Sequence, residues 1–208
     1  LLDPQNAQTS FKNKIYRGFL LLLNEKCFCK FIVRIKMCTG YNFMWIIQNS
    51  NDVHEIFQAH RSKARNLHTY DFSTLYTSIP HDKLKQQLTL IVLKAFKGMN
   101  KKFIHVNNNQ ARWANDKNRK KGIFFDSTLI IEMLVWLIDN TYVSVGNKTF
   151  RQEIGIPMGT DCAPYLANLF LFAYEFDFMN TKLKEKDFET LPKFTTCCRF
   201  SDDLLAIK

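Results

Sequence analysis

The chain has 208 residues, enough for one large domain or two small ones with a substantial hydrophobic core. Apolar residues make up 46% and aromatic residues 14% of the sequence, which excludes a disordered or low-complexity chain. Its 29 lysines and arginines outnumber the 19 acidic residues, and the resulting net charge of +10 favours a polyanionic partner such as nucleic acid. No apolar run approaches the roughly 20 residues that span a bilayer, so we expect no membrane segment.

The six cysteines do not follow the spacing of a disulfide framework or of a zinc finger. Cys27 and Cys29 are separated by one residue, and Cys197 and Cys198 are adjacent. This usage predicts reduced thiols and an intracellular protein, nuclear or cytoplasmic, that is not secreted. Because the chain starts at Leu1 and stops soon after an Asp-Asp pair, we also expect it to be part of a longer protein.

Hydrophobic periodicity predicts alternating helices and strands along the chain. Residues 53–65 fit one helix face, and Leu67–Phe72 alternates like a strand whose Asp71 points away from the core. After a turn, a helix is expected over residues 82–95 with Asp82 as its cap. The further expected elements are a hairpin of residues 103–106 and 111–114, a helix from Asp126 to Asp139, a hairpin of residues 141–145 and 148–154, a helix over residues 161–179, and a hairpin of residues 193–200 and 204–207.

Three carboxylates stand out as candidates for chemistry. Asp71 lies on the open face of its strand, whereas Asp202 and Asp203 lie at the tip of an apolar hairpin. Adjacent residues on a regular strand face opposite sides, so an Asp-Asp pair can serve one site only at a turn. Close carboxylates repel each other without a counter-ion, and Mg²⁺ is typically held by carboxylates together with substrate phosphates and water. Taken singly, each residue also fits a solvated turn or a surface charge.

Three segments then resemble the polymerase motifs of reverse transcriptases, in the same order and with similar spacing. Tyr70–Pro80 (YDFSTLYTSIP) resembles motif A, Gly155–Phe170 (beginning GIPMGTDCAP) resembles motif B, and Phe200–Asp203 (FSDD) resembles motif C. The residues of these motifs are most similar to those of Penelope-like retroelement reverse transcriptases. The resemblance begins near Tyr41 and continues to the end of the chain.

This resemblance implies an α+β fold with a polymerase palm-type antiparallel sheet and helices packed on one face. Residues 1–66 would be partial fingers and residues 67–208 the palm, and we expect neither a thumb nor an endonuclease domain in the chain. The helices over residues 82–95 and 161–179 would cover the face of the sheet opposite the carboxylates. The fingers lysine and arginine that grip a triphosphate in the family are not identified in residues 1–40.

The resemblance also implies a role for individual residues. Asp71 and Asp202 would be the main ligands of two Mg²⁺ ions, for which Mn²⁺ could substitute, with Asp203 as the third catalytic carboxylate and the Phe72 carbonyl as a backbone ligand. Tyr76 would lie under the incoming sugar, where a bulky ring excludes a 2′-hydroxyl and favours dNTPs. The other implied contacts are Ser73, Met158 and Gly159 with the nucleotide, and Gly155, Pro157, Phe200 and Ser201 with template and primer. Ser201 departs from the family, which usually has a larger apolar residue there.

The expected function is therefore RNA-directed DNA polymerase activity. The chain would transfer deoxynucleotides to a primer 3′-hydroxyl, with an RNA template, a DNA primer and dNTPs as partners. A second interpretation remains open, namely a truncated and catalytically inactive retroelement remnant that at most binds nucleic acid. A terminal transferase or an RNA-directed RNA polymerase is a third option, and Tyr76 argues against the use of ribonucleotides. The oligomeric state and the template stay open.

Overall fold

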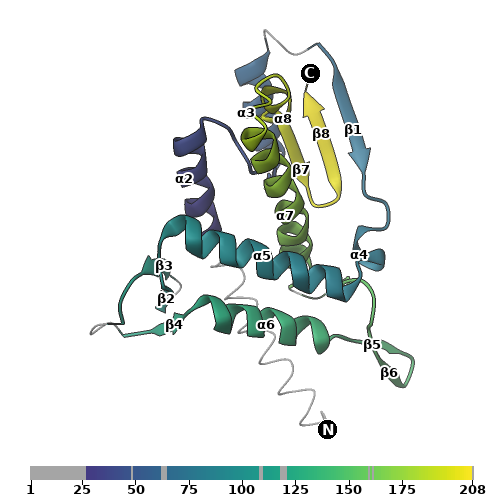
Figure 1. The fold of residues 1–208 in the computed structure, drawn as a ribbon. Helices are drawn as coiled ribbons and strands as arrows, with labels where there is room; N and C mark the ends of the chain where they lie inside the picture. Colours follow the sequence, from purple (N-terminus) through teal and green to yellow (C-terminus); the bar gives the residue numbers. More distant parts are fainter. Residues whose placement is uncertain are drawn as a thin grey trace.

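The computed structural model of the protein describes residues 27–47, 49–61, 65–107, 110–117, 121–158, 160 and 162–207. Within these residues the chain forms seven helices and three small antiparallel sheets, which confirms the expected α+β class (Figure 1). Residues 1–26, 48 and 62–64 of the segment predicted to contain partial fingers, residues 1–66, lie outside the described residues. None of the described helices is long and apolar enough to cross a membrane.

The central sheet has three strands in the order β1-β8-β7. β1 (Leu67–Asp71) lies at one edge, β8 (Asp203–Ile207) in the middle, and β7 (Cys197–Phe200) on the other side, with antiparallel pairing throughout. A parallel bridge from Ile46 to Arg199 places the segment before α3 (Ser50–His60) beside β7. All five residues of β1 are exposed, so the edge that carries the first candidate carboxylate is open to solvent.

α7 (Ala163–Lys184) lies beside this sheet and is apolar on nearly all sides, with eleven buried residues (Figure 1). A helix that is apolar on all sides must be buried by neighbouring elements on all sides. α5 (His81–Met99) supplies part of it by crossing α7, and it also packs against α6 (Ser127–Asp139) and α2 (Cys29–Thr39). The prediction that both long helices lie on the sheet therefore needs correction, because α5 packs mainly on other helices.

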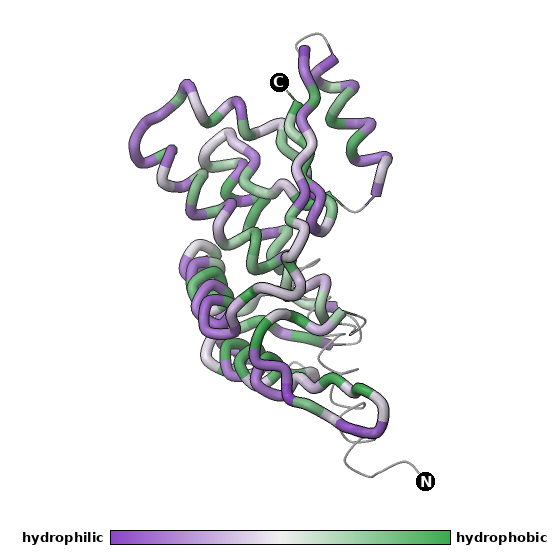
Figure 2. Tube along the Cα trace, turned by 90° about the vertical axis from the view of Figure 1, so that its right-hand side faces the viewer, coloured by the Kyte–Doolittle hydropathy of each residue, from purple (hydrophilic) through white to green (hydrophobic). Residues whose placement is uncertain are grey.

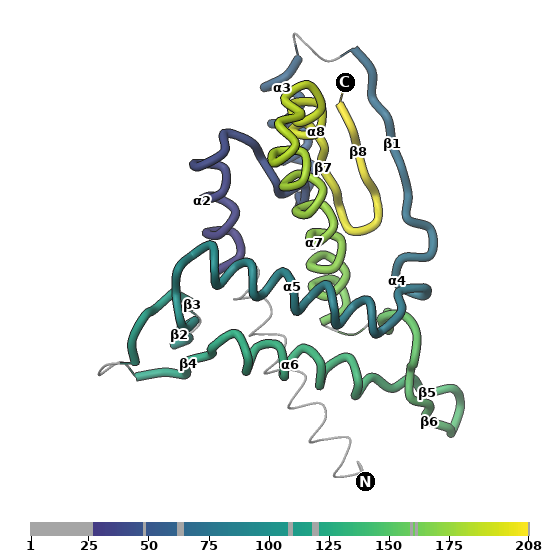
Figure 3. The backbone as a smooth tube through the Cα atoms, in the orientation of Figure 1, coloured from purple at the N-terminus to yellow at the C-terminus, as the bar shows by residue number. Residues whose placement is uncertain are grey.

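The remaining elements mostly follow the predicted pattern, and Figure 3 traces their order. The helix expected from Asp126 forms as α6, and the Asp126 carboxylate caps it by accepting a hydrogen bond from the Leu129 N–H at 2.9 Å. The cap of α5 was assigned wrongly, because Pro80 holds the N-cap position and Asp82 lies inside the first turn. The other elements are α3 (Ser50–His60), α4 (Leu75–Ser78), β2 (Phe103–Asn107), β3 (Gln110–Ala114), β4 (Ile123–Phe125), β5 (Tyr142–Val145), β6 (Lys148–Arg151) and α8 (Leu191–Phe194).

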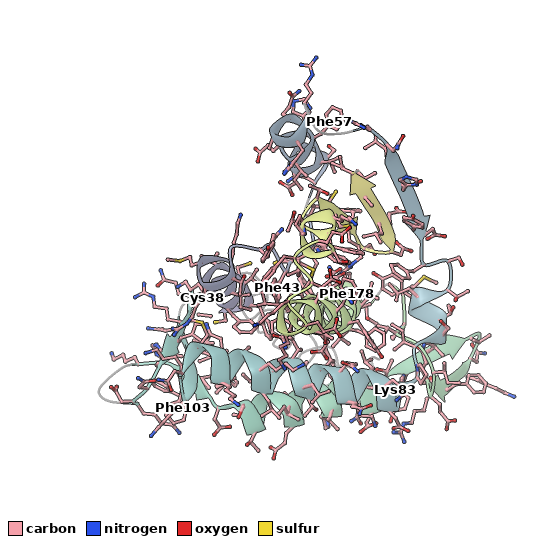
Figure 4. The ribbon with its side chains drawn as sticks, turned by 45° about the horizontal axis from the view of Figure 1, so that its top comes forward. Cys38, Phe43, Phe57, Lys83, Phe103 and Phe178 are labelled. Atoms are coloured by element: carbon pink, nitrogen blue, oxygen red, sulfur yellow. The ribbon has the colours of Figure 1, made fainter. Side chains whose placement is uncertain are left out.

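The core is rich in phenylalanine, in keeping with the 19 such residues in the sequence. Phe176 on α7 lies 5.7 Å from Phe31 of α2 and 5.7 Å from Phe43, measured between ring centroids. Figure 4 shows Phe43 near the middle of the molecule. Figure 2 shows hydrophobic and hydrophilic stretches alternating along the helices, the pattern of helices with a buried face. Aromatic contacts thus join α2 to α7 and help to fix the helix beside the sheet.

All six cysteines lie in described residues, and none forms a disulfide, as expected. Cys27 is fully buried, and burial raises its pKa to about 12, whereas Cys38 is exposed. We expect iodoacetamide at pH 8 to label Cys38 readily and Cys27 only after unfolding, because the thiolate is the reactive species. Mass spectrometry of tryptic peptides measures both rates, and equal labelling of the two in the folded protein would contradict the prediction.

The raised pKa of Cys27 also predicts that the fold loses stability at alkaline pH. The folded pKa of Cys27 lies above its ordinary value of 9.0, so the neutral thiol is favoured by folding. Its contribution to stability is fully present below about pH 9 and is lost as the pH rises toward 12. Urea unfolding of the native protein and of Cys27→Ala between pH 8 and pH 11 should show the smaller pH dependence in the variant.

Candidate active site

The first and third motifs meet in the central sheet. The antiparallel pairing of β1 with β8 places Asp71 directly opposite Asp203. Directly opposed residues of an antiparallel pair share one face, with Cβ atoms about 4.5–5.5 Å apart. Both residues are exposed. Two carboxylates from distant parts of the sequence are therefore neighbours on one open face of the sheet.

Asp202 lies in the tight turn between β7 and β8, as the sequence predicted. Phe200 pairs with Asp203 across the hairpin, which leaves Ser201 and Asp202 as the two central turn residues. Ser201 has a φ of 56°, in the left-handed region that hairpin turns require. The Asp202 carbonyl accepts a hydrogen bond from the Phe72 N–H at 3.1 Å, so the turn is also tied to the end of β1.

Within the described part of the chain, no basic side chain pairs with the three carboxylates. Among the residues that the structure describes, neither Asp71, Asp202 nor Asp203 forms an ion pair with a lysine, arginine or histidine. Like charges directly opposite one another destabilise a sheet, and a bound cation would remove this cost. Carboxylate oxygens are the ligands that Mg²⁺ and Mn²⁺ prefer, so the donor set fits a hard divalent ion.

The structure does not gather all three carboxylates into one cluster. No group of three or more His, Cys, Asp and Glu residues in the described part of the chain is arranged as a metal site. The register pairs Asp71 with Asp203, and Asp202 lies one residue away in the turn. Which carboxylates act as the main ligands thus stays a prediction from the resemblance.

The second motif packs against the first through the backbone. The Ile156 N–H donates to the Tyr76 carbonyl at 2.6 Å, and the Gly155 N–H donates to the Ile79 carbonyl at 2.8 Å. A ring nitrogen of His81 lies 2.8 Å from the Gly155 carbonyl oxygen. These contacts hold the start of motif B under the loop that follows β1, so Gly155 has a structural role in joining motifs A and B.

Gly155 is expected to tolerate no side chain. Its φ is +83°, and an added Cβ would lie 2.5 Å from the Tyr76 carbonyl oxygen. Gly146 is a matched control, because its φ is +59° but nothing lies within 4 Å of an added Cβ. We expect Gly146→Ala to cost about 1–2 kcal/mol of unfolding free energy from strain alone, and Gly155→Ala to cost clearly more. Urea denaturation measures both, and equal costs would show that the close approach is unimportant.

A side-chain hydrogen bond joins motif A to motif C. The Tyr76 hydroxyl and the Ser201 Oγ lie 2.9 Å apart, and both side chains are half-buried. The reverse transcriptases that the sequence resembles usually have a larger apolar residue at this position. Ser201 has a local partner instead, because only a polar side chain can bond to the tyrosine. The sequence alone placed these two residues in separate roles, at the nucleotide and at the primer.

The other predicted contacts lie on the surface near these segments. Ser73 is exposed in the turn after β1, Pro157 is half-buried, and the side chains of Phe200 and Met158 are 51% and 71% exposed. No contact within the described chain tests the predicted binding roles of these residues. Gly159, predicted to contact the nucleotide, lies outside the described residues.

Sequence reasoning missed a buried charged network behind the hairpin. Arg199 of β7 is only 1% exposed, and its guanidinium donates to the Glu175 Oε1 at 2.5 Å and to the Asn168 Oδ1 at 2.8 Å. It also donates to the Ser201 carbonyl at 2.7 Å, which ties α7 to the turn. Burial raises the pKa of Glu175, and the neighbouring guanidinium opposes that rise. A charged residue within an apolar strand was the available signal, since such residues are rarely buried unpaired.

The three motifs are thus held together by bonds within the chain itself. β1 pairs with β8, motif B is bonded to the loop after β1, and Tyr76 is bonded to Ser201. Arg199 adds a link from α7 to the hairpin. Comparison with known proteins adds no further support, because no protein-family model matches the chain and no curated protein matches it.

Proposed function

We propose that this chain is the palm of an RNA-directed DNA polymerase, similar to those of Penelope-like retroelements. The observation that carries the proposal is the direct opposition of Asp71 and Asp203 in the β1–β8 pair. It brings together the carboxylates of motifs A and C, which lie far apart in sequence. The backbone contacts of Gly155 and Ile156 with the motif A loop support the proposal further.

In this proposal the two strands and their turn provide the metal-binding groups. Asp71, Asp202, Asp203 and the Phe72 carbonyl would hold two Mg²⁺ ions, or Mn²⁺ in their place. When bound, such ions lower the pKa of an attacking hydroxyl and neutralise the departing pyrophosphate. The protein contributes rigidity, because cross-strand pairing and the Phe72–Asp202 backbone bond fix the carboxylates before substrate arrives.

Nucleotide choice is assigned to Tyr76. Its ring would lie beneath the incoming sugar, and the hydrogen bond to Ser201 limits the positions that the ring can adopt. A fixed bulky ring leaves no room for a 2′-hydroxyl, which favours deoxynucleotides. The template and primer would be held mainly through phosphates and A-form shape, in line with the net charge of +10.

Primer extension tests the proposal directly. The protein is given poly(rA) primed with oligo(dT), dTTP and MgCl₂, and the products are separated by gel electrophoresis. We expect extension with dTTP, none with UTP, and none when excess EDTA is present. Absence of extension with Mg²⁺ and with Mn²⁺, at concentrations where the protein binds the duplex, would contradict polymerase activity of this chain.

A second candidate function is nucleic-acid binding without catalysis, as in an inactive retroelement remnant. It is favoured by the lack of a three-carboxylate cluster among the described residues. Both candidate functions include the binding of nucleic acid, and only the first includes nucleotide transfer. Fluorescence anisotropy of a labelled duplex should show affinity that falls steeply with salt in both cases, whereas extension occurs only in the first.

A further inference from the structure

The sheet of β2, β3 and β4 has one buried face and one face that is open to solvent. Successive side chains of a strand point to opposite faces, and directly opposed residues of neighbouring strands share a face. The buried face carries Ile104, Ala111 and Phe125. The other face, here called the outer face, carries the aromatic side chains of Phe103, His105 and Phe124, which are only half-buried.

The three rings of the outer face contact one another. His105 stacks on Phe124 with ring centroids 4.5 Å apart and planes at 26°. Phe103 meets Phe124 edge to face at 6.1 Å. The rings therefore form one connected aromatic surface at the outside of the molecule. Partly exposed aromatic rings are the groups on which single-stranded nucleic acids stack their bases.

Cations lie directly beside these rings. Arg112 of β3 is opposed to His105 across the β2–β3 pair, so it belongs to the outer face, and it is exposed. The Lys117 Nζ lies 4.7 Å from the centroid of the Phe103 ring. The outer face thus combines flat apolar rings with positive charge.

The segment that forms this sheet carries most of the excess charge of the chain. Residues 101–125 contain seven lysines and arginines but only one acidic residue, Asp116. The resulting net charge of +6 is more than half of the +10 of the whole chain. Charge complementarity therefore favours a polyanion as the partner of this sheet.

Rings and cations together favour a single strand of nucleic acid. A polyanion without bases would pair with the cations and leave the rings without a partner. In a duplex the faces of the bases are covered by their neighbours in the stack, whereas an unpaired strand can turn its bases outward onto aromatic side chains. Its phosphates then lie within reach of lysine and arginine.

The outer face is separate from the opposed aspartates. Figure 1 shows β2, β3 and β4 at the end of α5 that lies away from α4 and motif A. α5 has 19 residues, which corresponds to a length of about 28 Å. Figure 4 shows the same separation, with Phe103 near one end of α5 and Lys83 near the other.

We propose that the outer face of the β2–β4 sheet binds an unpaired strand of RNA. Bases of the strand stack on the rings of Phe103, His105 and Phe124, and its phosphates pair with Arg112 and Lys117. The choice of RNA over DNA rests on the proposed function, in which the template is unpaired before it is copied and the DNA primer is paired to it. The stacking and the phosphate contacts do not depend on polymerase activity.

The test measures binding without catalysis. Fluorescence anisotropy follows an eight-nucleotide, fluorescein-labelled oligo(rU) in the presence of EDTA and in the absence of dNTPs. An abasic oligomer of the same length and charge is compared with it on the native protein. We expect the abasic oligomer to bind at least about tenfold more weakly, because it lacks every stacking contact.

Two pairs of variants locate the site. Phe124→Leu should weaken oligo(rU) binding about tenfold, whereas Phe150→Leu, which removes an exposed ring on β6, should leave it unchanged. Arg112→Gln should lower the slope of log affinity against log salt by about 0.7, the value for one phosphate contact to a single strand. Lys148→Gln on β6 is the matched control and should leave the slope unchanged. Circular dichroism shows that each variant is folded.

Four results would overturn the proposal. Equal affinity of the native protein for oligo(rU) and the abasic oligomer would show that only charge is recognised. Equal effects of Phe124→Leu and Phe150→Leu, or of Arg112→Gln and Lys148→Gln, would place the strand elsewhere. Tighter binding of oligo(dT) than of oligo(rU) would assign the outer face to DNA. Absence of oligo(rU) binding at physiological salt would exclude the site altogether.

This test and primer extension fail independently. Loss of extension with stacking and the salt slope as expected would contradict the polymerase and support the strand-binding face. Extension by a protein that binds oligo(rU) and the abasic oligomer equally would do the reverse. The oligomer comparison and the Arg112→Gln slope remain decisive even if Phe124→Leu fails to fold.

Discussion

Replacing Asp71 with asparagine is expected to abolish primer extension and, at the same time, to stabilise the fold. The side chain is opposed to Asp203 across the β1–β8 pair and has no cationic partner among the described residues. Removing one of two opposed charges relieves their repulsion, which raises the unfolding free energy by about 0.2–1 kcal/mol. The same change removes a proposed metal ligand, and we expect the extension rate to fall by about 10³-fold.

A matched control separates the two effects. Asp82 is also an exposed aspartate, but it lies in the first turn of α5 and its nearest cation is Lys85 at 3.8 Å. Asp82→Asn should leave extension unchanged and should not stabilise the protein, because the carboxylate there interacts favourably with the helix N-terminus. Extension rates and urea unfolding curves of the native protein and both variants give the comparison.

The pattern of results identifies the role of Asp71. Loss of extension together with a gain in stability indicates a carboxylate that is costly to the fold and needed for the reaction. Loss of extension together with loss of stability would indicate an ordinary structural residue. Full extension in Asp71→Asn would show that the opposed pair is not the catalytic centre. Asp203→Asn should show the same gain in stability, since it removes the other member of the pair.

Local patterns in the sequence were enough to predict most elements. The helix expected over residues 82–95 lies within α5, and its apolar residues are buried on one face because they recur about every 3.6 residues. Asp126 caps α6, and Gly146 and Asn147 form the turn of the β5–β6 hairpin. These features depend on residues that are close together in the sequence, so propensity and periodicity determine them.

The features that the sequence did not predict depend on contacts between residues that are far apart in the chain. Nothing local indicates that α5 packs on α7 instead of on the sheet. The partner of Asp71 also depends on cross-strand register, where a shift by one residue exchanges the two faces of a strand. The pairing of Asp71 with Asp203 is a contact of this kind, since it joins residues far apart in the sequence. The ion pair between Arg199 and Glu175 joins a strand to a helix, and it became visible only when both were placed.

Among the proposed substitutions, replacing Arg199 with methionine is expected to cause the largest loss of unfolding free energy. The guanidinium is buried and donates hydrogen bonds to Glu175, to Asn168 and to the Ser201 carbonyl. Its removal leaves the Glu175 carboxylate buried without a counter-ion, which typically costs 3–5 kcal/mol, or about 10 °C in melting temperature for a chain of this size. Thermal unfolding followed by circular dichroism measures the change.

Two further variants test the cause of the loss. Lys94→Met breaks a half-exposed ion pair with Asp177 between α5 and α7, and it should cost no more than about 1 kcal/mol. The double variant Arg199→Met with Glu175→Leu removes both buried charges and should recover most of the stability lost in the single variant. If the double variant is as unstable as Arg199→Met alone, the bonds to Asn168 and Ser201 matter more than the ion pair.

The pH dependence gives an independent check on Arg199→Met. Burial raises the pKa of Glu175 above its ordinary value of 4.5, and Arg199 is the group that opposes this rise. Without Arg199 the folded pKa rises further, so the folded state binds a proton more tightly than the unfolded chain does. The deficit relative to the native protein should therefore be smallest below about pH 4.5 and should grow as the pH rises through the folded pKa. A deficit that does not change with pH would show that Glu175 is not left charged and buried in the variant.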